Sequence, residues 1–436
     1  MIKQGVILAS GLGSRLNSEG RQEPKPLMPV GGMALIERVI TLMQSAGIEK
    51  IVVVVGYRGN QIVDYIRGKN MQGVFFAENP EYTKKNGISL LRSKDLLDDA
   101  PFLLSMSDHI FSRDFFADFI SKAESELESY DAVLSVDKNI EGVFDLDDAT
   151  KVALKNNEIV SIGKELADFD AVDTGLFLCK YTIFPKLQRI YDENGDVSIS
   201  EVMKSIAEDG KFVSSDMTGH LWQDVDTPSM KDEAEERLID HAFKDDESVD
   251  FFSNKLFFNM AKVIVLALFK IEHFDWKIAY YAVFVVSLIV TALALHTGFP
   301  EFSVLPLCLN VLLFYIGKIR RGVRTVGGES ENFVLSWNFN LLISVLPAML
   351  SAGNFTLLGA ILLFLSFFVV FVSFFMPSLI AGKIQLIPSE IANTFLSPSL
   401  FWICYSILIM ILPTWLFGFI PFVYLIVTLL FVEKRD

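Results

Sequence analysis

Cysteine is scarce in this chain, and acidic residues outnumber basic ones. The 436 residues include three cysteines, Cys179, Cys308 and Cys404, which stand far apart and lack the spacing of metal ligands. Neither a disulfide framework nor a zinc site is indicated. Asp and Glu number 53 against 38 Lys and Arg, which gives a formal net charge of −15. Because phosphate backbones attract basic faces, we expect no nucleic-acid partner.

We expect no secretory signal, since residues 1–4 lead directly into a short apolar segment. Long hydrophobic runs, in contrast, are abundant. Hydrophobic residues make up 51% of the chain, and they dominate beyond residue 251. The composition therefore predicts three parts: a cytosolic domain over residues 1–238, an acidic linker with an interfacial helix over 239–277, and a transmembrane domain over 278–436.

In the first part, short apolar runs alternate with amphipathic stretches. The expected strands cover residues 5–8, 51–55, 73–77, 101–106, 132–136 and 175–179, and the expected helices cover 35–46 and 61–67. Strands separated by helices favour a Rossmann-like α/β domain with a mostly parallel sheet and helices on both faces.

The apolar residues beyond 251 predict an interfacial helix followed by an all-α membrane domain. Residues 251–269 have the pattern of a helix that lies at the membrane surface. About six candidate spans follow, at residues 278–297, 302–317, 333–352, 355–376, 399–416 and 418–432. Basic residues follow the second, fourth and sixth spans, so the positive-inside rule places both termini in the cytoplasm. We therefore expect an integral protein of the inner or cell membrane with a cytoplasmic catalytic domain, in contact with membrane lipid.

The N-terminal segment 5–16 carries the strongest chemical signal. Gly11 and Gly13 follow an apolar strand, so backbone N–H groups there can approach phosphate oxygens. Arg15 and Lys25 add two cations that can neutralise a triphosphate and its leaving pyrophosphate. The segment is not a dinucleotide fingerprint, because Leu16 replaces the third glycine, and it is not a P-loop.

Residues 8–16 and 24–32 together resemble the signature of the sugar-phosphate nucleotidyltransferase family. These enzymes join a phosphorylated small molecule to a nucleoside monophosphate and release pyrophosphate. Within the family, the chain is most similar to the inositol-1-phosphate cytidylyltransferases, and the resemblance extends to about residue 238. It implies catalytic roles for Arg15 and Lys25, and a Mg²⁺ ion held by Asp108 and Asp226.

The same resemblance implies further binding residues. The nucleotide-binding set is Leu8, Ala9, Gly11, Gly13, Glu78, Asn86, Gly87 and Ser89. The set expected to bind the acceptor is Lys164, Asp173, Thr174 and Gly175. The implied reaction is an in-line displacement in which positioning and electrostatics supply the catalysis.

The membrane part resembles a degenerate CDP-alcohol phosphotransferase, with which inositol-phosphate cytidylyltransferases are often fused. That family needs a cluster of membrane aspartates to hold metal ions. Here the comparable residues 314–322 contain no acid, and neither does the following stretch 333–348. We therefore expect an anchor or docking platform rather than a second active site, and a separate CDP-alcohol phosphotransferase as the partner that consumes the product.

The sequence thus predicts a membrane-anchored nucleotidyltransferase that transfers CMP from CTP to inositol 1-phosphate or a related polyol phosphate. Three alternatives remain open at this point. The first is a sugar-1-phosphate or phosphocholine nucleotidyltransferase, which would use another nucleotide or acceptor. The second is a non-catalytic membrane scaffold that binds CDP-linked metabolites. The third is a carrier for lipid-linked cargo, although its spans would lack buried polar residues.

Overall fold

The computed structural model describes residues 2–13, 23–244 and 252–271, with isolated positions 282, 285, 286, 289, 312, 315–317, 319, 320, 322 and 323. Contacts divide the chain into two units. The first is Met1–His241 with Val323–Val326, and the second is Ala242–Gly322 with Gly327–Asp436. The expected spans between 333 and 432 lie outside the described residues, as do most positions of the expected spans 278–297 and 302–317.

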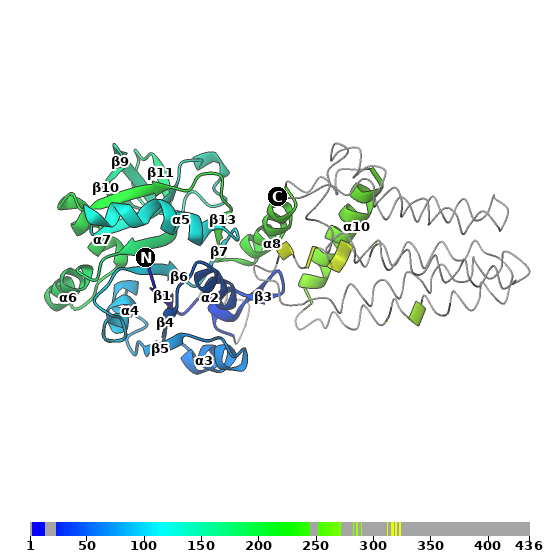
Figure 1. The fold of residues 1–436 in the computed structure, drawn as a ribbon, viewed down its shortest axis with the longest axis horizontal. Coiled ribbons are helices and arrows are strands. Elements are labelled where there is room, and N and C mark those ends of the chain that lie inside the picture. The colour runs from blue at the N-terminus through cyan, green and yellow to red at the C-terminus, as the bar shows by residue number, and fades with distance from the viewer. Residues whose placement is uncertain are drawn as a thin grey trace, which may run out of the picture. The chain divides into compact units, whose positions relative to one another are not determined.

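A nine-stranded sheet forms the centre of the first unit, in the order β5-β4-β1-β6-β11-β8-β12-β10-β9 (Figure 1). Its strands are β1 (Gln4–Ala9), β4 (Lys50–Val55), β5 (Val74–Glu78), β6 (Phe102–Met106), β8 (Ala132–Asp137), β9 (Lys151–Lys155), β10 (Glu158–Gly163), β11 (Ala171–Cys179) and β12 (Phe212–Asp216). Two short ladders accompany it: β2 (Pro29–Val30) with β3 (Met33–Ala34), and β7 (His109–Phe111) with β13 (Trp222–Asp224).

Helices cover the sheet on both faces. They are α2 (Leu35–Ser45), α3 (Gly59–Gly68), α4 (Asn86–Ser93), α5 (Phe115–Ala123), α6 (Ile183–Asn194) and α7 (Ile199–Glu208). A further helix, α8 (Pro228–Ala242), follows β13. Short 3₁₀ turns lie at η1 (Lys25–Leu27), η2 (Lys94–Leu96), η3 (Glu124–Glu128) and η4 (Ile140–Gly142). The capping box at the start of α7, Ser198 with Glu201, fixes where that helix begins.

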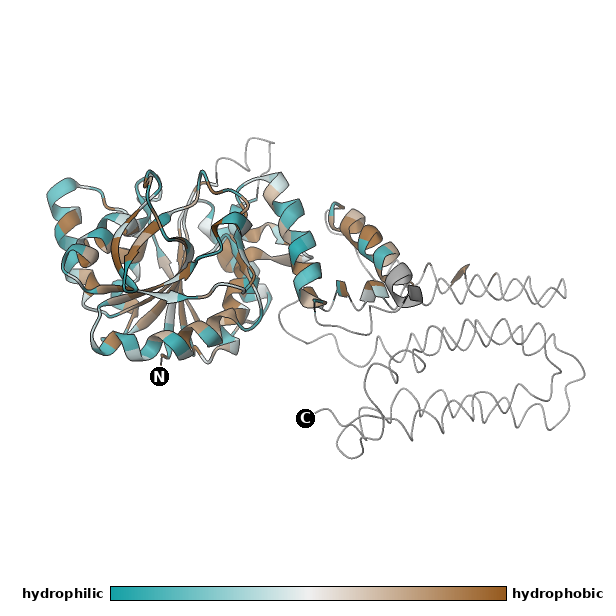
Figure 2. Ribbon diagram, turned by 90° about the horizontal axis from the view of Figure 1, so that it is seen from above, coloured by the Kyte–Doolittle hydropathy of each residue, from teal (hydrophilic) through white to brown (hydrophobic). Residues whose placement is uncertain are grey.

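Side chains on the two faces of the sheet pack into two separate hydrophobic clusters. In β1, Val6 and Leu8 join the cluster that packs on α4, α6 and α7. Ile7 and Ala9 point the other way and join the cluster that packs on α2, α3 and α5. This alternation follows from the two-residue period of a strand. Figure 2 shows hydrophobic residues along the strands and hydrophilic residues on the outer helix faces.

The sheet is mixed, whereas the sequence predicts a mostly parallel one. β5, β4, β1 and β6 pair in parallel, as expected. β11 then pairs antiparallel with β6 and β8, and β10 pairs antiparallel with β9 and β12. The expectation fails because β11 runs opposite to both of its neighbours, β6 and β8, and because β9 and β10 form a hairpin, which needs no crossover helix.

A register shift interrupts β11 opposite β8, between Asp173 and Phe177. Gly175 lies within it at a positive φ of 82°. Bulges of this kind are common beside active sites, because they redirect side chains out of the ladder.

In the second unit, α10 (Phe252–Phe269) matches the helix expected at residues 251–269. Its position at a membrane surface remains a prediction. Across the residues that the structure describes, no helix has both the length and the apolar character needed to span a bilayer.

Candidate active site

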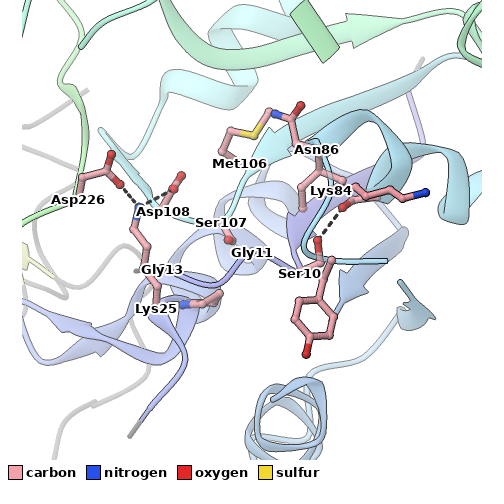
Figure 3. Close-up of a pocket in the computed structure, with 14 residues that line it drawn as sticks. Ser10, Gly11, Gly13, Lys25, Lys84, Asn86, Met106, Ser107, Asp108 and Asp226 are labelled. Atoms are coloured by element: carbon pink, nitrogen blue, oxygen red, sulfur yellow. Dashed lines mark hydrogen bonds and ion pairs between the residues drawn. The ribbon is translucent and has the colours of Figure 1, made fainter. Parts of the chain in front are cut away.

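A cavity of about 330 Å³ opens where β1 and β6 end. Open α/β sheets bind ligands at the carboxyl ends of their strands, which is where this cavity lies. It is lined by Leu8, Ser10, Gly11, Gly13, Lys25, Pro26, Tyr82, Lys84, Asn86, Ser89, Met106, Ser107, Asp108 and Asp226 (Figure 3).

The glycine loop is shaped by close packing against the segment that carries Lys25. Gly13 has a φ of +60°, and a Cβ placed on it would lie 2.8 Å from Lys25 Cβ. A side chain at this position would displace the lysine stem, so the close approach requires glycine. The loop therefore brings its backbone beside the Lys25 side chain.

A buried chain of hydroxyl and amide groups supports the loop from below. Ser10 Oγ lies 2.6 Å from Ser89 Oγ, and Asn79 Nδ2 donates to Ser89 Oγ at 3.0 Å. Ser10 follows β1, Ser89 lies in α4 and Asn79 follows β5, so this chain joins three elements. Because these side chains are buried, their mutual hydrogen bonds avoid a desolvation cost and hold the loop against α4.

Lys25 bridges the two carboxylates that the sequence singles out. Its Nζ lies 2.6 Å from Asp108 Oδ2 and also pairs with Asp226 Oδ1 (Figure 3). These partners are 83 and 201 residues away in the chain. Asp108 follows β6, and Asp226 follows β13. The antiparallel pairing of β13 with β7, together with the bond from Val225 N–H to the Asp108 carbonyl at 2.9 Å, joins the two segments.

The pKa values of Lys25 and Asp108 are shifted by their neighbours. Burial alone would lower the pKa of Lys25, but the Asp108 and Asp226 carboxylates raise it above its usual 10.5. Burial alone would raise the pKa of Asp108, but Lys25 and a hydrogen bond from His109 lower it far below its ordinary value. At neutral pH the Lys25 side chain is therefore an ammonium and the Asp108 side chain a carboxylate.

This donor set fits a divalent cation such as Mg²⁺. Asp108 and Asp226 already contact a single cationic atom, so they can also converge on one metal ion. Mg²⁺ is commonly held by one or two carboxylates, with phosphate and water completing its coordination. Three or more His, Cys, Asp or Glu side chains do not gather into a metal site anywhere in the described part of the chain.

The start of α4 forms another wall of the cavity, and contacts with the α6–α7 connection fix it. Asn86 Oδ1 accepts a hydrogen bond from Ile199 N–H at 3.0 Å, so this oxygen is already engaged. A Cβ on Gly87 would lie 2.6 Å from the Val197 carbonyl oxygen. Gly87 is therefore a packing residue in this structure, whereas Asn86 and Ser89 face the cavity.

The residues expected to bind the acceptor lie in two places, and none of the four lines the cavity. Lys164 directly follows β10 and pairs with Asp148 at 2.6 Å. Thr174 is fully buried, and its hydroxyl donates to the Ser135 carbonyl. Asp173 Oδ1 accepts from Gly175 N–H at 2.7 Å, and burial raises the pKa of Asp173 to about 6. Gly175 packs against His109, next to Asp108.

Two other predicted residues are not part of the cavity wall: Ala9 is buried, and Glu78 is exposed at the end of β5. Arg15 lies outside the described residues. The nucleotide-binding and acceptor-binding roles of all these positions remain predictions.

Sequence reasoning missed several cavity residues: Ser10, Pro26, Tyr82, Lys84, Met106 and Ser107. The sequence could have indicated three of them, Ser10, Met106 and Ser107, because they lie at or directly after the ends of predicted strands. Ser10 directly follows β1, and Met106 and Ser107 lie at the end of β6, its neighbour in the sheet. Strand ends that pair in parallel lie at the same edge, so their next residues share a site. Tyr82 and Lys84 lie in an irregular segment, and no comparable pattern identifies them.

Comparison with known proteins assigns the class. Residues 5–209 match the family model described as the MobA-like NTP transferase domain. Residues 5–209 therefore match a nucleotidyltransferase domain, and for this part of the chain the enzyme class implied by the glycine-loop signature is confirmed.

The individual relatives are more specific. The chain is 34% identical over 245 residues to a bifunctional IPC transferase and DIPP synthase of Rubrobacter xylanophilus, covering 54% of this chain and 53% of that protein. A protein of the same name from Thermococcus kodakarensis is 35% identical over 243 residues, covering 56% and 52%. A solved structure of the inositol-1-phosphate CTP transferase from T. maritima shares 26% identity, with a TM-score of 0.47, over 52% of this chain and 91% of that one.

The chain spans about half the length of the curated relatives it matches. In each case the aligned part also amounts to little more than half of this chain.

Proposed function

We propose that this enzyme transfers CMP from CTP to inositol 1-phosphate, or to a closely related polyol phosphate, and releases pyrophosphate. The observation that carries the proposal is the convergence of Lys25, Asp108 and Asp226 beside the glycine loop. Similarity to proteins named as IPC transferases and as an inositol-1-phosphate CTP transferase supports the choice of CTP and of the acceptor.

The reaction follows from the charges at this site. An anionic oxygen of the acceptor phosphate attacks the α-phosphorus of CTP and forms a new P–O bond. The bond from the α-phosphorus to the bridging oxygen breaks, and pyrophosphate leaves with the electron pair. No side chain has to remove a proton, because the attacking phosphate is already ionised at neutral pH.

The chain's own groups position and stabilise this displacement. The backbone of Gly11 and Gly13 approaches the phosphates, and the Lys25 ammonium neutralises charge on the α-phosphate and the leaving group. Asp108 and Asp226 would hold the Mg²⁺ ion, which supplies further charge neutralisation when bound. Lys25 then exchanges its carboxylate partners for phosphate oxygens.

The test is pyrophosphate release by the purified full-length chain in detergent with Mg²⁺. CTP, UTP, dTTP, ATP and GTP are each paired with inositol, glycerol, choline and hexose phosphates. We expect turnover with CTP and inositol 1-phosphate, and loss of at least about 100-fold in Asp108→Asn and Asp226→Asn. Lys50→Met, at an exposed ion pair, is the control and should keep full activity.

Turnover with a different pair would keep the enzyme class but replace the substrate. Binding of CTP without turnover of any pair would contradict the proposal and favour the scaffold alternative.

We further propose that the second unit anchors the enzyme in a membrane with the catalytic domain on the cytoplasmic side. The apolar composition beyond residue 278 supports this, as does α10, where Met260 and Val263 are 46% and 68% exposed. An apolar surface of this kind suits a lipid interface. Membrane fractions washed with alkaline carbonate should retain the full chain. Release of the chain into the wash would contradict anchoring.

A further inference from the structure

His109 lies directly beside the metal-site carboxylate and contacts only one of its two oxygens. His109 Nδ1 lies 2.8 Å from Asp108 Oδ1, and Lys25 Nζ lies 2.6 Å from Asp108 Oδ2. The two oxygens of Asp108 therefore have different partners: Oδ1 contacts the imidazole, and Oδ2 faces the Lys25 ammonium. A bond to Oδ1 fixes the rotation of the carboxylate and hence the direction of Oδ2.

The direction of this hydrogen bond follows from the chemistry of the two groups. An ionised carboxylate can only accept hydrogen bonds, so Nδ1 must carry the proton and donate it. The bond is thus charge-assisted, which makes it stronger than a bond between neutral groups. It also fixes the orientation of the imidazole ring.

The ring is held from two further sides. It stacks on Phe111 with centroids 6.0 Å apart and an angle of 20° between the planes. Its Nε2 edge faces Gly175, where a Cβ would lie only 2.6 Å from Nε2. The ring is also mostly buried, with its side chain 14% exposed. His109 therefore fills the space between the bulge of β11 and the Asp108 carboxylate.

We propose that His109 is a positioning residue that orients Asp108 for the divalent cation, and that Gly175 is glycine because it must leave room for this imidazole. The inference rests on the proposed function only in assigning a cation to Asp108 and Asp226. It adds a group behind the metal ligand and a steric link from the β11 bulge to the metal site. Hydrogen bonds behind a ligating carboxylate commonly change metal affinity 10- to 100-fold.

Two variants separate the hydrogen bond from the packing of the ring. His109→Phe keeps an aromatic ring on Phe111 but removes the donor. His109→Asn removes the ring but can place an amide N–H near the position of Nδ1. The probe is Mn²⁺ alone, with affinity measured by electron paramagnetic resonance on the full-length chain in detergent. Asp108→Asn marks the affinity left when the ligand itself is lost.

We expect His109→Phe to weaken Mn²⁺ binding by about 10-fold or more, and His109→Asn to stay within about 3-fold of the original chain. In turnover, excess Mg²⁺ should restore kcat of His109→Phe but not of Asp108→Asn. The reverse order, with the Phe variant normal and the Asn variant weak, would show that only ring packing matters and would overturn the proposal. If the unaltered chain itself fails to bind Mn²⁺, the proposed metal site fails instead.

Gly175→Ala supplies a second, independent test. The added Cβ would push against the imidazole and should weaken Mn²⁺ binding. In the His109→Asn background the ring edge is gone, so the same substitution should have a clearly smaller effect. Equal effects in both backgrounds would contradict the steric link, because they would reflect only the strain of alanine at a positive φ.

Discussion

At the scale of single residues, Lys25 neutralises two neighbouring carboxylates, Asp108 and Asp226. Two carboxylates at close range would repel each other and lower the stability of the fold. The Lys25 ammonium lies between them, and its side chain is only 10% exposed. It therefore holds Asp108 and Asp226 close together, in a geometry that a metal ion could also use.

Replacing Lys25 with methionine tests this role. Without divalent ions, we expect the free energy of unfolding to fall by about 2 kcal/mol, because two partly buried carboxylates lose their counter-charge. Saturating Mg²⁺ should restore most of this loss, while turnover stays reduced about 100-fold or more. Calorimetry with and without Mg²⁺ measures the first effect. Lys50→Met is the control, and a Lys25→Met chain insensitive to Mg²⁺ would contradict the interpretation.

Asp173 predicts a dependence of stability on pH. Burial raises its pKa from 3.8 to about 6, so the folded chain binds this proton more tightly than the unfolded chain does. The stabilisation is complete below about pH 4 and is lost as the pH rises through about 6. Its upper limit is about 3 kcal/mol, less where water reaches the carboxyl group.

Asp173→Asn stays neutral at every pH and still accepts the bond from Gly175 N–H. We expect it to equal the original chain near pH 3 and to be more stable above pH 7. Cys179, which is buried in β11, can report unfolding. Its labelling by a pyridyl disulfide in a urea series, read by mass spectrometry of its peptide, gives the stability at each pH. A constant difference between the two chains at all pH values would exclude this titration as the cause.

At the scale of elements, the sequence predicts the parts of the site that lie on long, regular strands. β1, β4, β5 and β6 have strong apolar patterns, so their order along the chain and the loop after β1 could be predicted. The meeting of Asp108 with Asp226 depends on β7 and β13, each of three residues. Strands so short carry no periodic signal, and only the family resemblance paired these residues.

The bulge of β11 explains why the orientation of the residues expected to bind the acceptor could not be predicted from the sequence. In a regular strand Asp173 and Gly175 would share one face, and Thr174 would point to the other. The register shift alters this geometry, and no residue pattern in the sequence locates the shift. Asn86 is a similar case, because its side-chain oxygen accepts a hydrogen bond from the backbone of Ile199, which is 113 residues away.

The close packing of the start of α4 against Val197 can be tested by substitution. Gly87→Ala would place a Cβ 2.6 Å from the Val197 carbonyl oxygen and push the start of α4 away from it. Asn86 and Ser89 would move with the helix, so we expect KM for the nucleotide to rise about 10-fold and stability to fall by about 1–3 kcal/mol. Gly68→Ala, at the end of α3 with open space around it, should leave KM unchanged. Equal KM values for both variants would count against a role for α4 in binding.

At the scale of the molecule, the first unit contains everything that its core needs. All members of its two hydrophobic clusters lie between Ile2 and Met217. Among the described residues, Val323 brings contacts from a later part of the chain into this unit: the fully buried Arg38 donates to its carbonyl at 2.7 Å, and its side chain packs against Gly31. The catalytic unit should therefore work without the apolar half, at a small cost in stability.

A chain ending at residue 244 tests this. We expect nucleotidyl transfer within about 2-fold of the full chain, and a free energy of unfolding lower by about 1 kcal/mol because Arg38 loses an acceptor. The truncated chain should also no longer sediment with membranes. Steady-state kinetics, urea unfolding and fractionation measure the three effects. Loss of transfer in a folded fragment would show that the second unit contributes to catalysis.

The distance in sequence between Lys25 and Asp226 has a consequence for synthesis. The glycine loop and Lys25 leave the ribosome early, Asp108 follows, and Asp226 emerges almost at the end of the first unit. At about 5–20 residues per second, the last carboxylate appears about 10–40 s after the lysine. During that interval Lys25 has only Asp108 as a carboxylate partner, and the β7–β13 ladder cannot form. The nascent enzyme thus becomes competent to bind its substrates only when nearly the whole domain has been made, just before the apolar half begins to emerge.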